Sequence, residues 1–190
     1  AGDLLNKFSG QKFTLVQQDI LKFDFTTMPE GYKIVANIPY YITSSLLRVI
    51  CESDNRPARA ALLVQKEVAE RVAALAGDLS ILAVSVQLYA VATLGELVPA
   101  ELFSPPPKVD SQILKLHYFS EPLAKDVDRV MHFVKAGFSS PRKKLRSSLA
   151  AGLGVSVESA EEMLTRSNIS PDRRAQTVSI EEWLKLSENN

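Results

Sequence analysis

The residues best suited to chemistry form the tetrapeptide Asn37-Ile38-Pro39-Tyr40, here called the acceptor turn. The asparagine oxygen and a backbone carbonyl of this turn could accept both hydrogens of an exocyclic amine such as adenine N6. That contact would favour a pyramidal nitrogen whose lone pair points at an electrophilic methyl group, and it would be strongest in the transition state. The proline stiffens the turn, and the tyrosine ring could stack on a base. A plain strand-ending turn is the competing interpretation, because Asn and Pro both favour turns.

The acceptor turn is expected at the end of a strand in an α/β sheet. A β-rich run at Lys33–Ala36 ends directly before it, and open α/β sheets bind ligands at the carboxyl ends of their strands. The alternation of β-rich and helical patterns predicts further elements on both sides of this strand. The expected strands are Phe13–Gln17, Ala60–Val64, Ala90–Val98 and Val109–Tyr118, and the expected helices are Thr43–Glu52, a segment from Val64 to Leu75, and Leu79–Tyr89.

From Pro122 onward the pattern is purely helical. The signals are an apolar stripe from Val127, a basic helix from Pro141 to about Gly154, a cap at Ser156, and a capping box of Ser179 and Glu182 with Val178 near Trp183. We therefore expect an α/β fold, with a partial Rossmann-like sheet over residues 1–119 whose first strands are missing. A linker near residues 120–125 would lead into a small all-helical C-terminal domain over residues 120–190.

Four cations close together in the helical part are candidates for contact with RNA. They are Arg142, Lys143, Lys144 and Arg146, on a segment whose other side is apolar. Phosphate contacts of this kind would position a nucleic acid without reading its sequence, whereas a solvated helix face is the usual role of a charge run. The formal net charge is zero, with 22 basic and 22 acidic residues, which argues mildly against a nucleic-acid binder. A protein with zero net charge can still present one basic surface to RNA, so the local cluster is the stronger indication.

Composition is that of an ordinary globular protein. Hydrophobic residues make up 46% and charged residues 23% of the 190, which is enough to bury a core. The single cysteine, Cys51, excludes an internal disulfide framework and suits a reducing cytosol. No apolar run reaches the roughly 18 residues of a membrane span. His117 and His132 have no acidic or cysteine partner at ligand spacing, so we expect no metal site.

Together with the acceptor turn, five further segments resemble the KsgA-type family of rRNA adenine N6,N6-dimethyltransferases in their order and spacing. The resemblance covers essentially the whole chain, and its triple-proline string and basic segment are highly specific. The five segments are Gln65–Val68, Phe103–Ser111, Pro141–Leu149, Asp172–Ala175 and Ser179–Trp183.

The resemblance implies a two-domain, S-adenosylmethionine-dependent enzyme of the cytoplasm, monomeric when complete and without metal or membrane. Its substrate would be small-subunit rRNA or the pre-30S particle. There it would convert two adjacent adenosines of a 3′-terminal hairpin to N6,N6-dimethyladenosine during ribosome biogenesis. Residues 1–119 would be part of the methyltransferase domain, and residues 120–190 would be the RNA-binding domain.

The resemblance also assigns roles to the residues of the acceptor turn. Asn37 and the Ile38–Pro39 backbone match the acceptors for the target amine. Tyr40 matches the ring on one face of the target base, and Phe103 matches the aromatic residue that closes the other face. The less favoured alternative for this phenylalanine is a core residue beside a proline turn.

Cofactor and RNA contacts follow in the same way. Asp19 and the Ile20 N–H match the groups that recognise the adenine of the cofactor, and Asn37 borders the cofactor as well. An aspartate after a strand is otherwise a common turn or cap residue. Lys108 and the four-cation cluster match the expected contacts with RNA.

Some features depart from the family. No G-x-G turn follows an expected strand, since the triplet Gly152-Leu153-Gly154 lies in the helical part, and Asp3 lies too close to the start to be assigned to the cofactor ribose. We therefore expect the N-terminal half of the cofactor site to be absent, and this chain alone to bind S-adenosylmethionine weakly or not at all and to be inactive. Tyr41 stands where the family often has Asn, and Thr43–Ser45 replaces its more usual Ser-Thr-Pro. Both changes can alter how the target base enters.

Two other functions stay open. One is the sibling family that methylates a large-subunit rRNA adenine and confers macrolide resistance, which shares the acceptor turn. The triple proline and the segment Arg142–Leu149 fit the small-subunit type better. The other is a non-catalytic rRNA-binding assembly factor on the same scaffold, which would need no cofactor.

Overall fold

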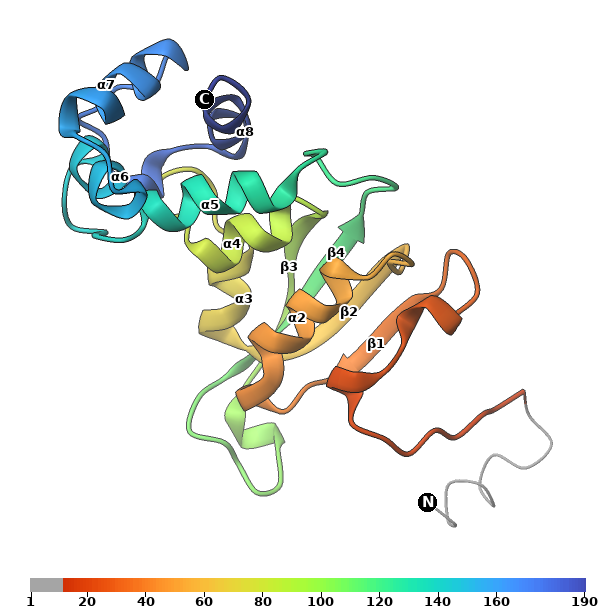
Figure 1. The fold of residues 1–190 in the computed structure, drawn as a ribbon. Helices are drawn as coiled ribbons and strands as arrows, with labels where there is room; N and C mark the ends of the chain where they lie inside the picture. Colours follow the sequence, from red (N-terminus) through yellow and green to blue (C-terminus); the bar gives the residue numbers. More distant parts are fainter. Residues whose placement is uncertain (1–11) are drawn as a thin grey trace.

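A computed structural model describes residues 12–190 and shows a four-stranded mixed sheet with strand order β1-β2-β4-β3 (Figure 1). Strand β1 (Lys33–Asn37) runs parallel to β2 (Arg59–Gln65). Strand β4 (Ser111–Tyr118) pairs antiparallel with both β2 and β3 (Ala90–Val98). These four strands are the ones that the later β-rich runs predict, and the α/β class is confirmed.

The strand expected at Phe13–Gln17 is wrong, because these residues form no strand. A strand needs a neighbour to pair its backbone N–H and C=O groups. In the part of the chain that the structure describes, no strand lies beside the free edge of β1. The run at residues 13–17 does not pair with that edge either, so its β-forming side chains alone do not make it a strand.

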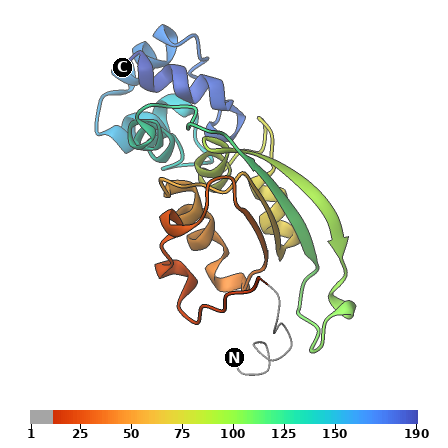
Figure 2. The ribbon, with the colours of Figure 1, turned by 90° about the vertical axis from the view of Figure 1, so that its right-hand side faces the viewer.

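Three helices cover one face of the sheet, as Figure 2 shows: α2 (Thr43–Glu52), α3 (Lys66–Val72) and α4 (Ile81–Gln87). Leu62 and Val64 of β2 are fully buried in a core to which all three helices contribute. Val35 of β1 points to the opposite face and is 86% exposed, as the alternation of side chains along a strand requires. The expected helices are thus confirmed, with α3 and α4 both shorter than their predicted spans.

The helical part consists of α5 (Val127–Gly137), α6 (Leu145–Leu153), α7 (Val157–Arg166) and α8 (Ile180–Glu188). These helices pack around the fully buried ring of Trp183. Helix α4 joins the two parts, since its Val84 lies in the helical core while its Val86 lies in the core of the sheet. The expected division near residue 120 therefore falls between parts that are packed together through α4.

Local signals set most ends of these helices. The Ser156 hydroxyl accepts a hydrogen bond from Ser159 N at 3.1 Å and begins α7. The capping box predicted from Ser179 and Glu182 is present at the start of α8. Gly154, with φ of 70°, ends α6 in the left-handed conformation that favours glycine.

The basic helix does not begin at Pro141, as the sequence indicates, but at Leu145. No side chain caps α6. Instead, the amide of Leu145 donates to the Arg173 carbonyl at 2.7 Å, and the amide of Arg146 donates to the Pro171 carbonyl at 3.2 Å. A distant segment thus satisfies the first amides of the helix, and residues 141–144 form a turn before it, here called the basic turn.

Within residues 12–190, every helix is too short or too polar to cross a lipid bilayer.

Candidate active site

The acceptor turn borders a cavity of about 310 Å³ at the carboxyl end of β1. The main-chain anchor of the turn is the amide of Ile38, which donates to the Leu63 carbonyl of β2 at 3.2 Å, and the Ile38 side chain is 2% exposed. The turn therefore sits firmly on the sheet with its other side open. The residues lining the cavity are Asn37, Ile38, Pro39, Tyr40, Phe103, Pro105 and Pro107.

Asn37 is exposed, and its side-chain amide has no hydrogen-bond partner among residues 12–190. Tyr40 is held differently. Its hydroxyl shares a 2.8 Å hydrogen bond with Oγ of Ser111, a fully buried residue at the start of β4. The Tyr40 ring is thus fixed in orientation, while the amide oxygen of Asn37 is available to a ligand.

The opposite wall is formed by the connection between β3 and β4, residues 99–110, here called the proline loop. Its ends are tied together, because the Asp110 carboxylate accepts the amide of Ala100 at 2.9 Å. The Asp110 carbonyl accepts the amide of Lys66 at 3.0 Å, which fastens the loop to α3. Phe103 is half-buried within it and donates its amide to the Ala100 carbonyl at 3.2 Å. The second ring of the cavity is therefore also held in place.

This arrangement can accommodate a flat, amine-bearing ring. Two aromatic residues from different segments, Tyr40 and Phe103, line the cavity together with the unpaired amide of Asn37. Sequence reasoning alone placed Asn37 and Tyr40 at a strand end. The structure adds Phe103, which is 66 positions from Asn37 in the sequence but lines the same cavity. Lys108 is exposed on the proline loop, one residue beyond the lining residue Pro107.

Asp19 and Ile20 do not line this cavity. The Asp19 carboxylate accepts a hydrogen bond from Leu21 N at 3.0 Å and caps the short 3-10 helix η1 (Ile20–Lys22), which lies against α2. The interpretation of Asp19 as a cap is therefore confirmed. Its second carboxylate oxygen has no partner within the described residues, so one acceptor of this group stays free.

The four-cation cluster divides into two pairs. Arg142 and Lys143 lie in the basic turn, exposed and without an ion-pair partner among residues 12–190. Lys144 instead lies 3.0 Å from the Asp172 carboxylate, and Arg146 contacts both Glu161 at 2.6 Å and Asp172 at 3.4 Å. The hydrogen bond from Lys144, followed by the charges of Lys144 and Arg146, holds the pKa of Asp172 below its usual range.

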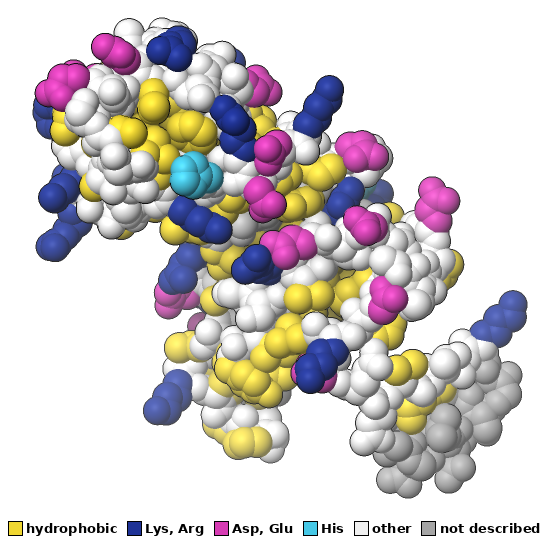
Figure 3. Space-filling view, viewed as in Figure 1, with side chains coloured by type: hydrophobic (Ala, Val, Ile, Leu, Met, Phe, Trp, Pro, Cys, Tyr) yellow, Lys and Arg dark blue, Asp and Glu magenta, His cyan; other side chains and the backbone are white. Residues whose placement is uncertain are grey.

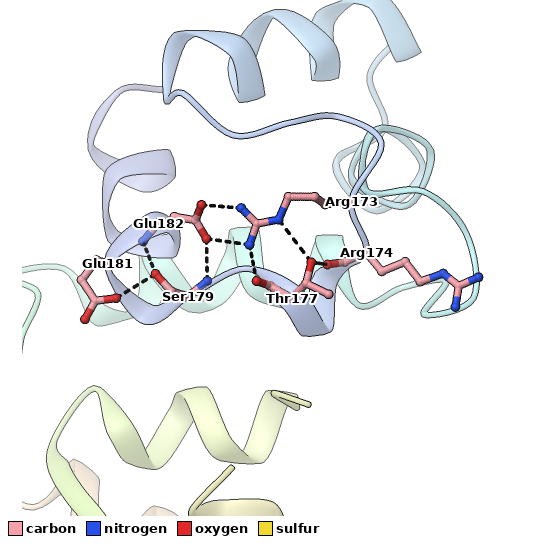
Figure 4. Close-up of polar contacts among 6 residues, drawn as sticks. All are labelled: Arg173, Arg174, Thr177, Ser179, Glu181 and Glu182. Atoms are coloured by element: carbon pink, nitrogen blue, oxygen red, sulfur yellow. Dashed lines mark hydrogen bonds and ion pairs between the residues drawn. The ribbon is translucent and has the colours of Figure 1, made fainter. Parts of the chain in front are cut away.

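The segment that meets the start of α6 is organised by Arg173, as Figure 4 shows. Its guanidinium binds both carboxylate oxygens of Glu182, with 2.9 Å from Nη2 to Oε2, and it also contacts the hydroxyl and carbonyl of Thr177. Burial acts to raise the pKa of Glu182, but hydrogen bonds from Arg173 and from the amide of Ser179 leave it lowered. Arg173 therefore ties the start of α6, through the bond of its carbonyl to the Leu145 amide, to the start of α8.

Sequence reasoning missed Arg174 as a separate candidate. Its side chain points away from the Arg173 network in Figure 4 and is exposed, with no side-chain partner in the described part of the chain. It adds a third unpaired cation beside the start of α6. A signal for Arg174 was available in the sequence, because it directly follows Arg173. When one of two adjacent arginines faces inward to an acid, the other is expected to face solvent.

Among residues 12–190, no group of three or more His, Cys, Asp or Glu side chains could hold a metal ion.

The chain is thus a Rossmann-like α/β protein with a cavity, lined in part by two aromatic residues, at the carboxyl end of β1. Residues 3–189 match the family model described as "Ribosomal RNA adenine dimethylase", and the chain belongs to this family.

The chain is also similar to individual relatives. It is 42% identical over 193 residues to "Ribosomal RNA small subunit methyltransferase A" of Dehalococcoides mccartyi (strain CBDB1), a match that covers 96% of this chain and 65% of the relative. The chain thus spans slightly less than two thirds of the length of that curated protein.

Two solved structures share the fold. A 23S rRNA methyltransferase, ErmE, is 28% identical with a TM-score of 0.77, and the match covers 100% of this chain and 77% of that one. A dimethyladenosine transferase from Plasmodium falciparum is 24% identical with a TM-score of 0.81, over 97% of this chain and 74% of that one.

Proposed function

We propose that this chain contains the acceptor-base site and RNA-binding surface of a small-subunit rRNA dimethyltransferase. The enzyme would transfer methyl groups from S-adenosylmethionine to N6 of two adjacent adenosines in a 3′-terminal hairpin, as a step in ribosome biogenesis. The observation that carries this proposal is the cavity in which the unpaired Asn37 amide lies with the rings of Tyr40 and Phe103. Membership of the adenine dimethylase family supports it.

The chemistry follows from the free acceptors of the turn. The Asn37 oxygen would accept one N6 hydrogen of the target adenine. The Pro39 carbonyl already accepts the amide of Ile42 at 3.1 Å, which favours the Ile38 carbonyl as the acceptor of the second hydrogen. Two such contacts stabilise the pyramidal amine more than the planar one, and therefore act on the transition state. The product nitrogen can release its extra proton afterwards, so no strong general base is needed.

S-adenosylmethionine, when bound, would supply the electrophilic methyl group. The residues of this chain fit it in part. Asp19 keeps a free carboxylate oxygen and Asn37 an unpaired amide, but no G-x-G turn follows a strand, because the triplet Gly152-Leu153-Gly154 lies at the end of α6. The expectation that this chain alone binds the cofactor weakly stays a prediction. A calorimetric titration beside a relative of full length would measure it.

RNA would be held by cations that no acid neutralises. In our proposal Arg142, Lys143 and Arg174 contact phosphates beside α6, and Lys108 contacts them beside the cavity. Lys144 and Arg146, which the sequence also suggests as RNA contacts, are engaged with acids and would act mainly on the fold. Residues 120–190 would serve as the RNA-binding part and residues 1–119 as part of the methyltransferase. The complete protein would act as a cytoplasmic monomer on the pre-30S particle.

The experiment that tests this function uses a protein of the relatives' full length that contains this chain. It is incubated with labelled S-adenosylmethionine and either small-subunit or large-subunit rRNA, and the digested nucleosides are separated by mass. We expect N6,N6-dimethyladenosine from the small-subunit RNA alone. Methylation of the large-subunit RNA would instead support the sibling activity, and binding without methylation would support an assembly factor.

A further inference from the structure

Tyr41 directly follows the lining residue Tyr40 and leaves its aromatic ring in solvent. It lies in the short 3-10 helix η3 (Tyr40–Ile42) and is 88% exposed. Its side chain makes no hydrogen bond and no ring contact within residues 12–190. The ring therefore contributes nothing to the core, although its neighbour Tyr40 is tied to Ser111.

The backbone beneath this ring is fixed. The amide of Ile42 donates to the Pro39 carbonyl at 3.1 Å, and the amide of Thr43 donates to the Tyr40 carbonyl. Thr43 is 2% exposed and is the first residue of α2. Tyr41 thus extends from a rigid base, so a ligand that stacks on it needs to order only the side chain.

The opposite wall of the cavity has a similar feature. Leu102 directly precedes Phe103 in the 3-10 helix η4 (Ala100–Leu102) and is 72% exposed. Figure 3 shows apolar side chains over the beginning of α2 and at the tip of the proline loop. Single exposed apolar residues are common on protein surfaces. Here, however, each of the two aromatic lining residues, Tyr40 and Phe103, has a sequence neighbour with an exposed apolar side chain.

We propose that Tyr41 and Leu102 form a second subsite, which holds the nucleotide next to the target base in a looped or single-stranded RNA. The inference rests on the proposed function. A base that enters the cavity leaves its neighbour without a stacking partner. An exposed tyrosine ring restores that stacking for any base, because every base has a π face, and an apolar side chain can fill the gap left in the stack. The subsite would thus position the RNA without selecting a base.

The test is an equilibrium titration of this chain with a labelled hairpin RNA whose loop holds one adenosine flanked by uridines. Three RNAs are compared: the intact hairpin, one that is abasic at the adenosine, and one that is abasic at the flanking positions. Tyr41→Ala and Leu102→Ala are measured beside two controls. Tyr41→Phe keeps the ring, and Leu75→Ala removes a leucine that is 81% exposed and does not line the cavity.

Tyr41→Ala should weaken binding of the intact RNA about 5- to 150-fold, which corresponds to the roughly 1–3 kcal/mol of one stacked base. Leu102→Ala should weaken it less. Both effects should largely vanish on RNA that lacks the flanking bases, and both controls should bind like the wild type. Equal weakening on the intact and flank-abasic RNAs, or no weakening, would overturn the subsite. If the wild type binds the RNA that is abasic at the adenosine as tightly as the intact RNA, the proposed function is contradicted, and the subsite with it.

Discussion

Gly137 is the position where the packing of the helical part can be tested most sharply. It is the buried last residue of α5. A Cβ placed there would lie 2.5 Å from Cη2 and 3.2 Å from Cζ3 of Trp183, and 3.3 Å from Cδ1 of Leu145. Trp183 is 0% exposed, so its ring cannot swing into solvent to make room. The glycine is therefore required by close packing of α5 against α6 and α8, since its φ is not in the left-handed region.

The magnitude follows from two opposing terms. Overpacking a core costs about 1–3 kcal/mol, whereas replacing a helical glycine by alanine gains at most about 1 kcal/mol. Carbon atoms prefer a separation of about 3.5–4.0 Å, so the 2.5 Å contact with Trp183 decides the sign. We expect Gly137→Ala to destabilise the protein by about 1–2 kcal/mol, which lowers Tm by about 2–8 °C in a chain of this size.

The assay is thermal and urea unfolding followed by circular dichroism. It compares the wild type with Gly137→Ala, Trp183→Phe and the double variant that carries both changes. The phenylalanine ring lacks the two atoms that the new methyl group meets. In that background Gly137→Ala should cost at least about 1 kcal/mol less than in the wild type, which is a measurable coupling. Strict additivity of the two changes, or a rise in Tm for Gly137→Ala alone, would refute the reasoning.

Two further predictions concern charge. Burial raises the pKa of the Cys51 thiol to about 12, from an ordinary value of 9.0. Because its folded pKa is the higher one, its contribution to stability is complete below pH 9 and is lost between pH 9 and about 12. The free energy of unfolding should fall over that range and fall less in Cys51→Ala; an identical pH profile in the variant would contradict this. Separately, Arg142→Ala with Lys143→Ala should lower the slope of log affinity for RNA against log salt by about 1.5. The ion-paired control, Lys144→Ala with Arg146→Ala, should change the slope less, and an equal change in both would argue against our division of the cluster.

Local features of the fold were predictable from the sequence. The acceptor turn follows β1 as expected, and the capping box at Ser179 and Glu182 forms as its residue types predict. Gly154 ends its helix where glycine was expected to do so. Each of these depends on residues within a few positions of one another, whose hydrogen bonds and conformational preferences are local.

Features that depend on distant segments were not predictable from patterns. The start of α6 is set by carbonyls of Pro171 and Arg173, so the proline signal at Pro141 placed it four residues too early. The basic cluster is split by Asp172 and Glu161, which no charge count along the chain reveals. The same limit applies to the strand expected at residues 13–17, because pairing requires a partner strand as well as β-forming side chains.

The candidate site was found by two kinds of signal. Residue chemistry alone identified Asn37 and Tyr40, whereas Phe103 entered only through the family resemblance. The structure places all three around one cavity because β4 pairs with β2, so that Ser111, directly after the proline loop, lies opposite Gln65, two residues beyond the partner of Asn37. Tyr41 was noticed only as a departure from the family, and its exposure is what gives it a candidate role.

The most direct test of the central claim is single-turnover methyl transfer by Asn37→Ala in a protein of the relatives' full length. The amide oxygen of Asn37 is unpaired at the rim of the cavity, so its loss should slow the chemical step at least about 100-fold, the effect of removing one oriented transition-state partner. Affinity for RNA should stay within a few-fold of the wild type. A turnover rate close to that of the wild type would show that this amide does not hold the target amine.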